Sequence, residues 1–242
     1  MKRAPASGND AAVAPRVRRG YFESRFGQLH VHNAMPPGGG FEEATALLCL
    51  HTGASSARLF RGFLEIMGRD RSTYAPDIPG YGESDAPPPR ATVADYAGGI
   101  GDFIDSMRFR QIDLLGYRAG AAIAAELAVA KPEQIRRLVL IGVALYPDAE
   151  REAFRRSPVT AAPADASWGA NALMQYPMRD RLASITQPVM VLRPRDDLWD
   201  ATARTREVLP RVRVVDLPDQ GGGLFDVAPQ VVAEAIRDFL KG

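Results

Sequence analysis

The sequence predicts an α/β fold with a mostly parallel, eight-stranded sheet flanked by helices. Short apolar runs alternate with longer segments of helical spacing, which is typical of such sheets. The segment Gly-Tyr-Arg-Ala-Gly at residues 116–120 lies between an apolar run and an alanine-rich stretch, where a sharp strand-to-helix turn is expected. The chain has 242 residues, of which 46% are hydrophobic and 24% charged, and this composition suits one globular domain.

Eight strands are expected from short apolar runs bounded by turn residues. The first two form a hairpin that turns at Phe26-Gly27. Most of the others are apolar on both faces, as strands of a parallel sheet covered by helices are. The expected strands are residues 21–25, 28–34, 46–51, 73–75, 111–115, 137–141, 188–192 and 212–217.

Five core helices are expected from the spacing of apolar residues. Thr92 is a suitable N-cap, and Asp95 three residues later completes a variant capping box. The alanine-rich helix is expected to pack closely against the sheet and to end at Lys131-Pro132, because proline cannot continue a helix. The expected helices are residues 57–67, 92–107, 119–130, 201–209 and 229–240.

The charge balance excludes some classes of partner. There are 30 basic and 29 acidic side chains, a net charge of +1, which gives no reason to expect nucleic acid or an anionic membrane. The single cysteine, Cys49, allows no intrachain disulfide and reads as a reduced core thiol. The sequence contains no run of about 18 apolar residues, so a membrane-spanning helix is not expected.

Residues 1–19 are rich in alanine, proline and arginine and lack a continuous apolar segment. They are therefore expected to form a disordered basic leader rather than a secretory signal, with a transit peptide as the alternative. A cytoplasmic location follows as the expectation.

Five motifs occur in a specific order along residues 20–242. They are His-Thr-Gly at 51–53, Asp-Ile-Pro-Gly-Tyr-Gly-Glu-Ser-Asp at 77–85, Gly-Tyr-Arg-Ala-Gly at 116–120, Arg-Asp-Asp at 195–197 and Leu-Pro-Asp-Gln-Gly-Gly-Gly at 217–223. In this order they resemble the α/β-hydrolase superfamily. The resemblance implies that these segments are the oxyanion turn, a Pro-Gly-x-Gly loop, the nucleophile elbow, the acid loop and the histidine loop.

Two positions of the implied catalytic triad depart from the family pattern. Arg118 stands where the family has its serine, and Gly222 stands where it has its histidine, so that the acid, Asp197, is the one family residue retained. Arginine is always charged and cannot act as an acyl nucleophile. The resemblance therefore implies the α/β-hydrolase fold without its serine-hydrolase chemistry.

The resemblance also implies a cap between the sixth and seventh strands, and here the cap is short. The core is expected at residues 20–146 and 187–242, with a reduced cap at 147–186 that holds one or two short helices near 149–155 and 178–185. A short cap predicts a shallow or open pocket, and an exposed groove of this kind is compatible with a homodimer.

Arg118 has two interpretations. In one, its side chain forms an ion pair with Asp197 or Asp196 and satisfies charges in a half-buried site. In the other, the guanidinium faces the pocket and binds a carboxylate, phosphate or enolate, helped by the backbone N–H groups of Gly53 and Ala119. Tyr117, beside it in the elbow, is a further candidate binding residue.

The remaining polar candidates have ordinary structural interpretations. His51 ends the third strand near the site, yet the resemblance implies a structural role for it. Ser55 or Ser56 is expected to cap the helix that begins near residue 57, and Ser84 to form hydrogen bonds within its turn. Asp196 and Asp197 have no histidine or cysteine beside them, so neither a metal nor a cofactor is expected.

Three functions remain open at this point. The first is a non-hydrolytic enzyme that stabilises an anion with Arg118. The second is a pseudoenzyme that binds a small molecule or serves as a protein-interaction module. The third is a hydrolase that uses an unusual water or His51, since oxyanion donors alone sustain weak turnover.

Overall fold

The computed structural model describes residues 15–37, 44–155 and 172–241. It contains an eight-stranded sheet in the order β1-β2-β4-β3-β5-β6-β7-β8. The first two strands are antiparallel to their neighbours, and β3 to β8 run parallel to one another, which confirms the predicted sheet. The strands are β1 (Arg18–Ser24), β2 (Gly27–Ala34), β3 (Ala44–Leu50), β4 (Arg71–Pro76), β5 (Ile112–Tyr117), β6 (Ile135–Ile141), β7 (Val189–Pro194) and β8 (Arg213–Leu217).

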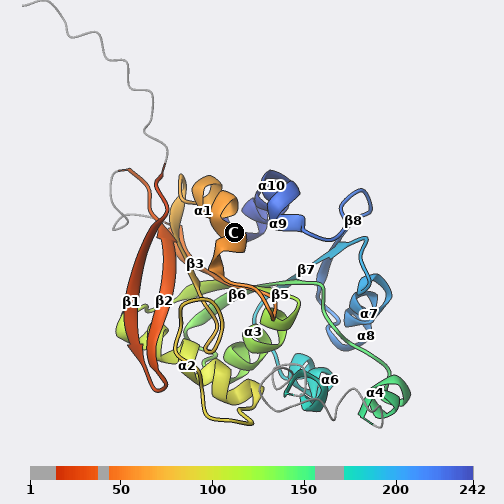
Figure 1. Cartoon of the computed structure of the whole chain (residues 1–242). Helices are drawn as coiled ribbons and strands as arrows, with labels where there is room; N and C mark the ends of the chain where they lie inside the picture. Colours follow the sequence, from red (N-terminus) through yellow and green to blue (C-terminus); the bar gives the residue numbers. More distant parts are fainter. Residues whose placement is uncertain (1–14, 38–43, 156–171, 242) are drawn as a thin grey trace, which may run out of the picture.

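Helices cover both faces of the sheet (Figure 1). The α1, α9 and α10 helices lie on one face, whereas α2 and α3 lie on the other, with α4 and α6 beyond α3. The helices are η1 (Ala57–Phe60), α1 (Arg61–Met67), α2 (Val93–Ser106), α3 (Ala119–Ala130), α4 (Asp148–Arg155), α6 (Met178–Ala183), α7 (Trp199–Ala203), α8 (Thr205–Val208), α9 (Leu224–Val227) and α10 (Pro229–Lys241).

Each face of the sheet has its own apolar core. One core includes Phe103 of α2 and Ile123 of α3, and the other includes Phe60 of η1 and Phe225 of α9. Because side chains of a strand point alternately to the two faces, the central strands β3, β5, β6 and β7 contribute to both cores. The pocket described below opens from the core on the α3 side.

The capping and packing of α2 and α3 follow the predictions. Thr92 and Asp95 form the capping box, with each side chain accepting a hydrogen bond from the other residue's backbone N–H. The α3 helix ends at Ala130, before Lys131-Pro132. A Cβ on Gly120 would overlap the carbonyl oxygen of Leu50, so only glycine lets the first turn of α3 approach β3 this closely.

Several predicted boundaries are wrong. Arg18 and Arg19 lie in β1, paired with β2, rather than in a disordered leader; the rest of that prediction falls largely on residues 1–14, outside the described residues. The helix expected at 57–67 begins as the 3₁₀ helix η1, and the helix expected at 201–209 is divided into α7 and α8.

The predicted serine cap of the first helix is also wrong. Ser56 is the N-cap residue of η1, but its side chain makes no capping hydrogen bond. Instead the Ala57 N–H donates to Oδ1 of Asp77 at 2.5 Å. A carboxylate from the loop after β4 therefore replaces the local hydroxyl, and it ties that loop to the start of η1.

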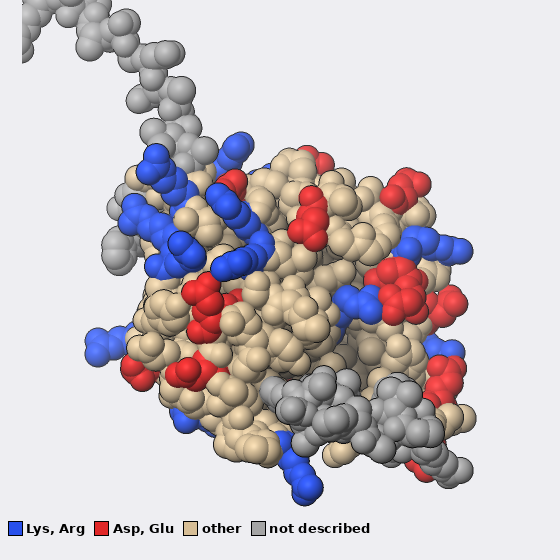
Figure 2. Space-filling view, viewed as in Figure 1, with Lys and Arg blue, Asp and Glu red and all other residues tan. Residues whose placement is uncertain are grey.

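Charges of both signs are distributed over the surface (Figure 2). Basic side chains gather on the part of this face nearest β1 and α1, and acidic side chains are interspersed over the rest. Among the described residues, no helix combines the length and the apolar character that crossing a bilayer requires.

Candidate functional site

Arg118 occupies the sharp turn between β5 and α3, as the sequence predicts. Its backbone has φ 54° and ψ −109°, a strained conformation for a residue other than glycine. The turn is held on both sides, because the Arg118 N–H donates to the Ile141 carbonyl at 2.7 Å and the Arg118 carbonyl accepts from Ala121 at 3.0 Å. The structure therefore keeps an elbow that presents the side chain of residue 118 above the carboxyl edge of the sheet.

The Arg118 guanidinium is bound to two carboxylates. Nη1 and Nη2 donate to Oδ1 and Oδ2 of Asp197 at 2.8 Å and 2.9 Å, and Nη1 also donates to Oδ2 of Asp196 at 3.0 Å. This confirms the interpretation of Arg118 as an ion-pair partner of the acid loop. Two carboxylates facing one guanidinium leave this cluster with a net charge of −1.

The ion pair changes the titration of both partners. Hydrogen bonds from Arg118 lower the pKa of the Asp197 carboxyl below its ordinary value. The same bonds to Asp197 raise the pKa of the Arg118 guanidinium, in spite of the cost of its partial burial. Both groups are therefore charged over the ordinary pH range.

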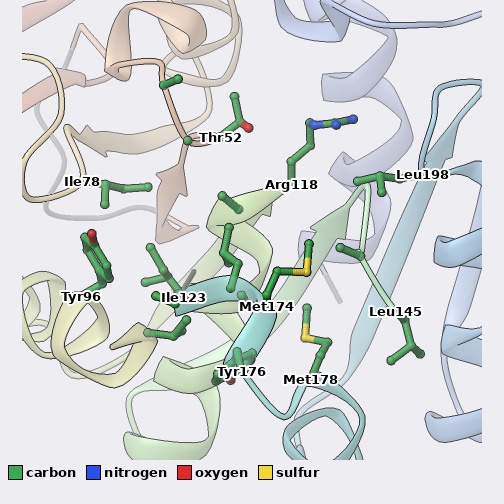
Figure 3. A pocket seen from close by; sticks show the side chains of 18 of the residues that line it. Thr52, Ile78, Tyr96, Arg118, Ile123, Leu145, Met174, Tyr176, Met178 and Leu198 are labelled. Atoms are coloured by element: carbon green, nitrogen blue, oxygen red, sulfur yellow. The ribbon is translucent and has the colours of Figure 1, made fainter. Parts of the chain in front are cut away.

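A cavity of about 420 Å³ lies beside the elbow. This volume falls within the range of small-molecule sites, so the reduced cap leaves a pocket of useful size. Among the described residues that line it, all but Arg118 and Arg151 are uncharged, and most are apolar, including Ile78, Ile123, Leu145, Met174, Met178 and Leu198. Figure 3 shows the guanidinium of Arg118 at one end of the pocket, while Tyr176 and Met178 lie toward the other.

The second cation of the lining, Arg151, belongs to the cap. Its Nη2 donates to the Tyr176 carbonyl at 3.0 Å. The Tyr176 hydroxyl in turn donates to Oε2 of Glu126 in α3 at 3.0 Å, and Arg181 of α6 lies 3.2 Å from the same carboxylate. These contacts fix the described part of the cap on α3. Helices α4 and α6 lie close to the expected positions, and the cap residues 156–171 fall outside the described residues.

Sequence reasoning missed most of the residues that form the pocket wall. Leu145 and Tyr146 follow β6, and Met174 and Tyr176 come from the cap. The apolar and aromatic side chains of Met174 and Tyr176 were a signal, but the weak periodicity of the cap left the faces of these residues undefined. Tyr81 was visible within the Pro-Gly-x-Gly loop but was not identified as a pocket residue.

Gly53 and Ala119 lie together at the pocket wall. A Cβ on Gly53 would lie 3.8 Å from the Ala119 Cβ. Ala119 is the first residue of α3, so its N–H has no acceptor within the helix. The expected pair of oxyanion donors is therefore adjacent in space, and both residues line the cavity.

Tyr117 is not placed as a binding residue. Its side chain is 4% exposed and packs in the core on the opposite face of the sheet, with its ring 5.3 Å from that of Phe225. The reason is the alternation of side chains along β5, which sends the residue before the elbow away from the pocket.

His51 is fully buried and uses both ring nitrogens. Nε2 accepts from the Ile78 N–H at 2.9 Å, so the proton lies on Nδ1, which donates to the Thr52 carbonyl at 2.6 Å. Burial lowers the pKa of the imidazole and keeps it neutral. His51 therefore joins the turn after β3 to the loop after β4, and it does not line the pocket.

The other two histidines lie in β2, away from the pocket. Nδ1 of His30 is 2.8 Å from Oδ2 of Asp77. Ser84 acts within the same turn, as predicted, since its Oγ accepts from the His30 N–H and donates to the Asp77 carbonyl, both at 2.9 Å. None of the chain's three histidines is a pocket residue.

Gly222 lies exposed in the loop after β8, and no atom lies within 4 Å of where its Cβ would be. Cys49 is fully buried in β3, and burial raises the pKa of its thiol, so it is not a reactive nucleophile. Among the described residues, no group of three or more histidine, cysteine, aspartate and glutamate side chains is arranged to hold a metal ion.

Comparisons with known proteins agree with this architecture. A family model described as alpha/beta hydrolase fold matches residues 45–174. The enol-lactonase from Burkholderia xenovorans LB400 superposes with a TM-score of 0.76 at 16% identity, over 92% of this chain and 100% of that one. At this identity the superposition shows the fold alone.

Sequence relatives match over shorter segments. An uncharacterized protein of Mycobacterium tuberculosis is 27% identical over 96 residues, which are 40% of this chain and 28% of that protein. A 2-hydroxymuconate semialdehyde hydrolase from Pseudomonas sp. (strain CF600) is 38% identical over 82 residues, 32% of this chain and 28% of the relative. A carboxylesterase from Bacillus subtilis (strain 168) is 27% identical over 134 residues, 53% of this chain and 44% of the relative.

The matched segments thus span less than half of the length of each of these relatives. The family model covers more than half of this chain, from β3 through the elbow to residue 174 in the cap. On that match and on the order of its strands, the chain belongs to the α/β-hydrolase fold family.

Proposed function

We propose that this protein binds a small organic molecule in the pocket beside Arg118 and does not carry out the acyl transfer of serine hydrolases. The observation that carries the proposal is the bidentate ion pair between Arg118 and Asp197 at the elbow. In this pair, the cation of Arg118 occupies the position of a nucleophile. It binds Asp197, the carboxylate that would orient a catalytic base.

Acyl transfer requires a nucleophile, a base within hydrogen-bond reach and a group that orients the base. At the elbow, Arg118 supplies no nucleophile, because its guanidinium stays protonated. Gly222 offers no base, and each ring nitrogen of His51 is already engaged in the core. No other histidine lines the pocket to replace it.

Binding, by contrast, needs only the features that remain. The cavity of about 420 Å³ has an apolar wall, and the cap is fixed over it by Tyr176 and Glu126. Apolar concave sites of this size are the ordinary form of small-molecule sites.

Hydrolysis by an unusual mechanism is the second candidate. The relatives named as a hydrolase and a carboxylesterase favour it, and so does the adjacency of Gly53 and Ala119, whose N–H groups would stabilise an oxyanion. A non-hydrolytic enzyme would need Arg118 to reach a developing anion, and its three hydrogen bonds to Asp196 and Asp197 oppose that role.

The test is turnover of p-nitrophenyl acetate, butyrate and octanoate by the full chain, with Arg118→Ala and Asp197→Ala prepared in parallel. We expect the wild type and both variants to show the same ester turnover, no higher than the trace background that all preparations share. Turnover by the wild type that is lost in either variant would overturn the proposal in favour of an unusual hydrolase. Turnover that survives in both but is lost with Ala122→Phe, which fills the pocket, would overturn it as well.

A further inference from the structure

We infer that the pocket takes a neutral, predominantly apolar molecule and excludes anions, although an arginine forms part of its wall. The inference rests on the proposed binding function and specifies its ligand. It follows from the contacts that the charged side chains among the described pocket residues make.

The charge of Arg118 is already balanced by its protein partners. Three of its five N–H groups donate to Asp196 and Asp197, which leaves the Nε–H and one Nη2–H beside two carboxylates. Asp196 is the more constrained partner, since its side chain is 4% exposed and its Oδ1 also accepts from the Leu198 N–H at 2.9 Å. An anion that approached Arg118 would therefore meet two fixed carboxylates and a cluster of net charge −1.

Arg151 is likewise engaged. Its Nη2 donates to the Tyr176 carbonyl, and its Nη1 lies 3.6 Å from Asp148. Below it, the buried carboxylate of Glu126 is matched by Arg181 and the Tyr176 hydroxyl. The two guanidinium groups of the described lining, Arg118 and Arg151, thus face three carboxylates, those of Asp148, Asp196 and Asp197.

The rest of the pocket wall favours the apolar part of a ligand. The end of the pocket away from Arg118 is formed by Ile123, Met178 and Tyr176, so a ligand buries its body there (Figure 3). At that end Ile123 and Met178 offer no donor and the Tyr176 hydroxyl already donates to Glu126, so a carboxylate, sulfonate or phosphate there would lose its hydration without gaining a partner. The backbone N–H groups of Gly53 and Ala119 lie at the other end, next to Arg118 and its two carboxylates, where the net charge of −1 opposes an anion. The pocket thus discriminates by the cost of burying charge rather than by a specific contact.

A matched pair of fluorescent probes tests the inference. N-phenyl-1-naphthylamine is neutral, and 1-anilinonaphthalene-8-sulfonate has the same skeleton with a sulfonate added. With the full-length wild type we expect the neutral probe to bind with a Kd on the order of tenfold lower than the anionic one. Ala122→Phe and Ala144→Phe, which place a ring in the cavity, should each weaken the neutral probe; Ala144 is exposed, so its variant carries little risk to folding.

Removing the acidic charges should reverse the discrimination. In Asp196→Asn/Asp197→Asn the cluster changes from −1 to +1, and we expect the anionic probe to bind on the order of tenfold more tightly while the neutral probe changes little. Asp197→Asn alone, at a side chain that is 68% exposed, should give a smaller change of the same sign without disturbing the buried partner.

The outcomes separate the two proposals. If the wild type binds the anionic probe as tightly as the neutral one, and Ala122→Phe abolishes both, the neutral-ligand inference fails and the binding function stands. If neither probe binds, or both filled-pocket variants leave binding unchanged, the pocket is not a ligand site and the proposed function fails together with the inference.

Discussion

Arg118 holds Asp197 through both terminal nitrogens of its guanidinium, at 2.8 Å and 2.9 Å, across the gap between the elbow after β5 and the loop after β7. The geometry is that of a fork facing a carboxylate, the strongest form of such a pair. One guanidinium thus occupies the elbow and engages the acid loop at once. The strained backbone at residue 118 nevertheless persists, because the surrounding hydrogen bonds to Ile141 and Ala121 hold it.

The two carboxylates that Arg118 binds should contribute unequally to stability. Arg118→Met removes the partner of Asp196, whose side chain is 4% exposed, and we expect a loss of about 1–3 kcal/mol in the free energy of unfolding. Asp197→Asn removes a charge that is 68% exposed, and its effect should stay below about 1 kcal/mol. Urea unfolding of both variants measures the difference. Equal losses would show that Asp196 does not depend on the guanidinium.

The scaffold should accept a catalytic triad. Arg118→Ser places a hydroxyl on the preserved elbow, and Gly222→His has open space for its side chain. The double variant frees Asp197 to orient the new imidazole. We expect its hydrolysis of p-nitrophenyl butyrate to exceed that of Arg118→Ser on the order of 10²-fold, the usual contribution of a general base.

The triple variant that adds Asp197→Asn is the matched control for this restoration. It should lose most of the gain, because the orienting carboxylate is removed while the nucleophile and base remain. A double variant no more active than Arg118→Ser would mean that the loop carrying Gly222 does not bring residue 222 within reach of the elbow.

The sheet and the elbow were predictable from the sequence because local patterns and ordered motifs determine them. The elbow depends on Gly120, which alone permits the close approach to β3, and the alanine-rich helix begins directly after it. Arg18 and Arg19 were misplaced because two charged residues resemble a disordered leader, whereas an edge strand exposes one face and tolerates such charges.

What the sequence could not predict depends on contacts between distant segments. Asp77 replaces Ser56 as the cap of η1 from 20 residues away, and no local pattern announces it. Asp196 joins Asp197 in binding Arg118 only because the loop after β7 reaches the elbow. The pocket wall combines the cap with the segment after β6, and the cap has too little periodicity for its inward face to be identified.

Stability should fall as the pH is lowered through the titration of His32. This side chain is 4% exposed, and burial, assisted by His30, lowers its pKa below the ordinary value of about 6.5. Below about pH 6.5, His32 is protonated in the unfolded chain while it stays neutral in the folded chain. The free energy of unfolding therefore decreases as the pH falls, by up to about 1.4 kcal/mol per pH unit for one such proton.

Urea unfolding at pH 7.5 and 5.5 measures this dependence, with His32→Phe as the variant that cannot titrate. The charges of Asp77, Arg19 and Arg58 also act on His32, and the variant keeps all three. We expect the variant to retain more of its stability at the lower pH than the wild type does. An identical slope in the two proteins would assign the pH dependence to other groups, of which the buried His51 is the next candidate.

A buried ion cluster lies at the opposite edge of the sheet from the pocket. Asp113 of β5 is fully buried; it accepts from Nη1 of Arg71 at 2.9 Å and from Nε and Nη2 of Arg136 at 2.9 Å and 2.7 Å. Arg136 also donates to the Leu240 carbonyl, so the cluster joins three strands to α10. Asp113→Asn leaves the buried Arg71 without a counter-charge and should cost about 3–5 kcal/mol.

Asp216→Asn is the matched control, because this carboxylate pairs with Arg193 while 40% exposed and its loss should cost less than about 1 kcal/mol. The two variants should bind the neutral naphthylamine probe equally well below their unfolding midpoints, since neither residue lines the pocket. Equal destabilisation would show that burial does not set the value of the Asp113 cluster. We do not expect Asp113→Asn to weaken probe binding while the protein is folded, because a rigid, close-packed core separates Asp113 from the pocket. Weakened binding would show that the two edges of the sheet are coupled.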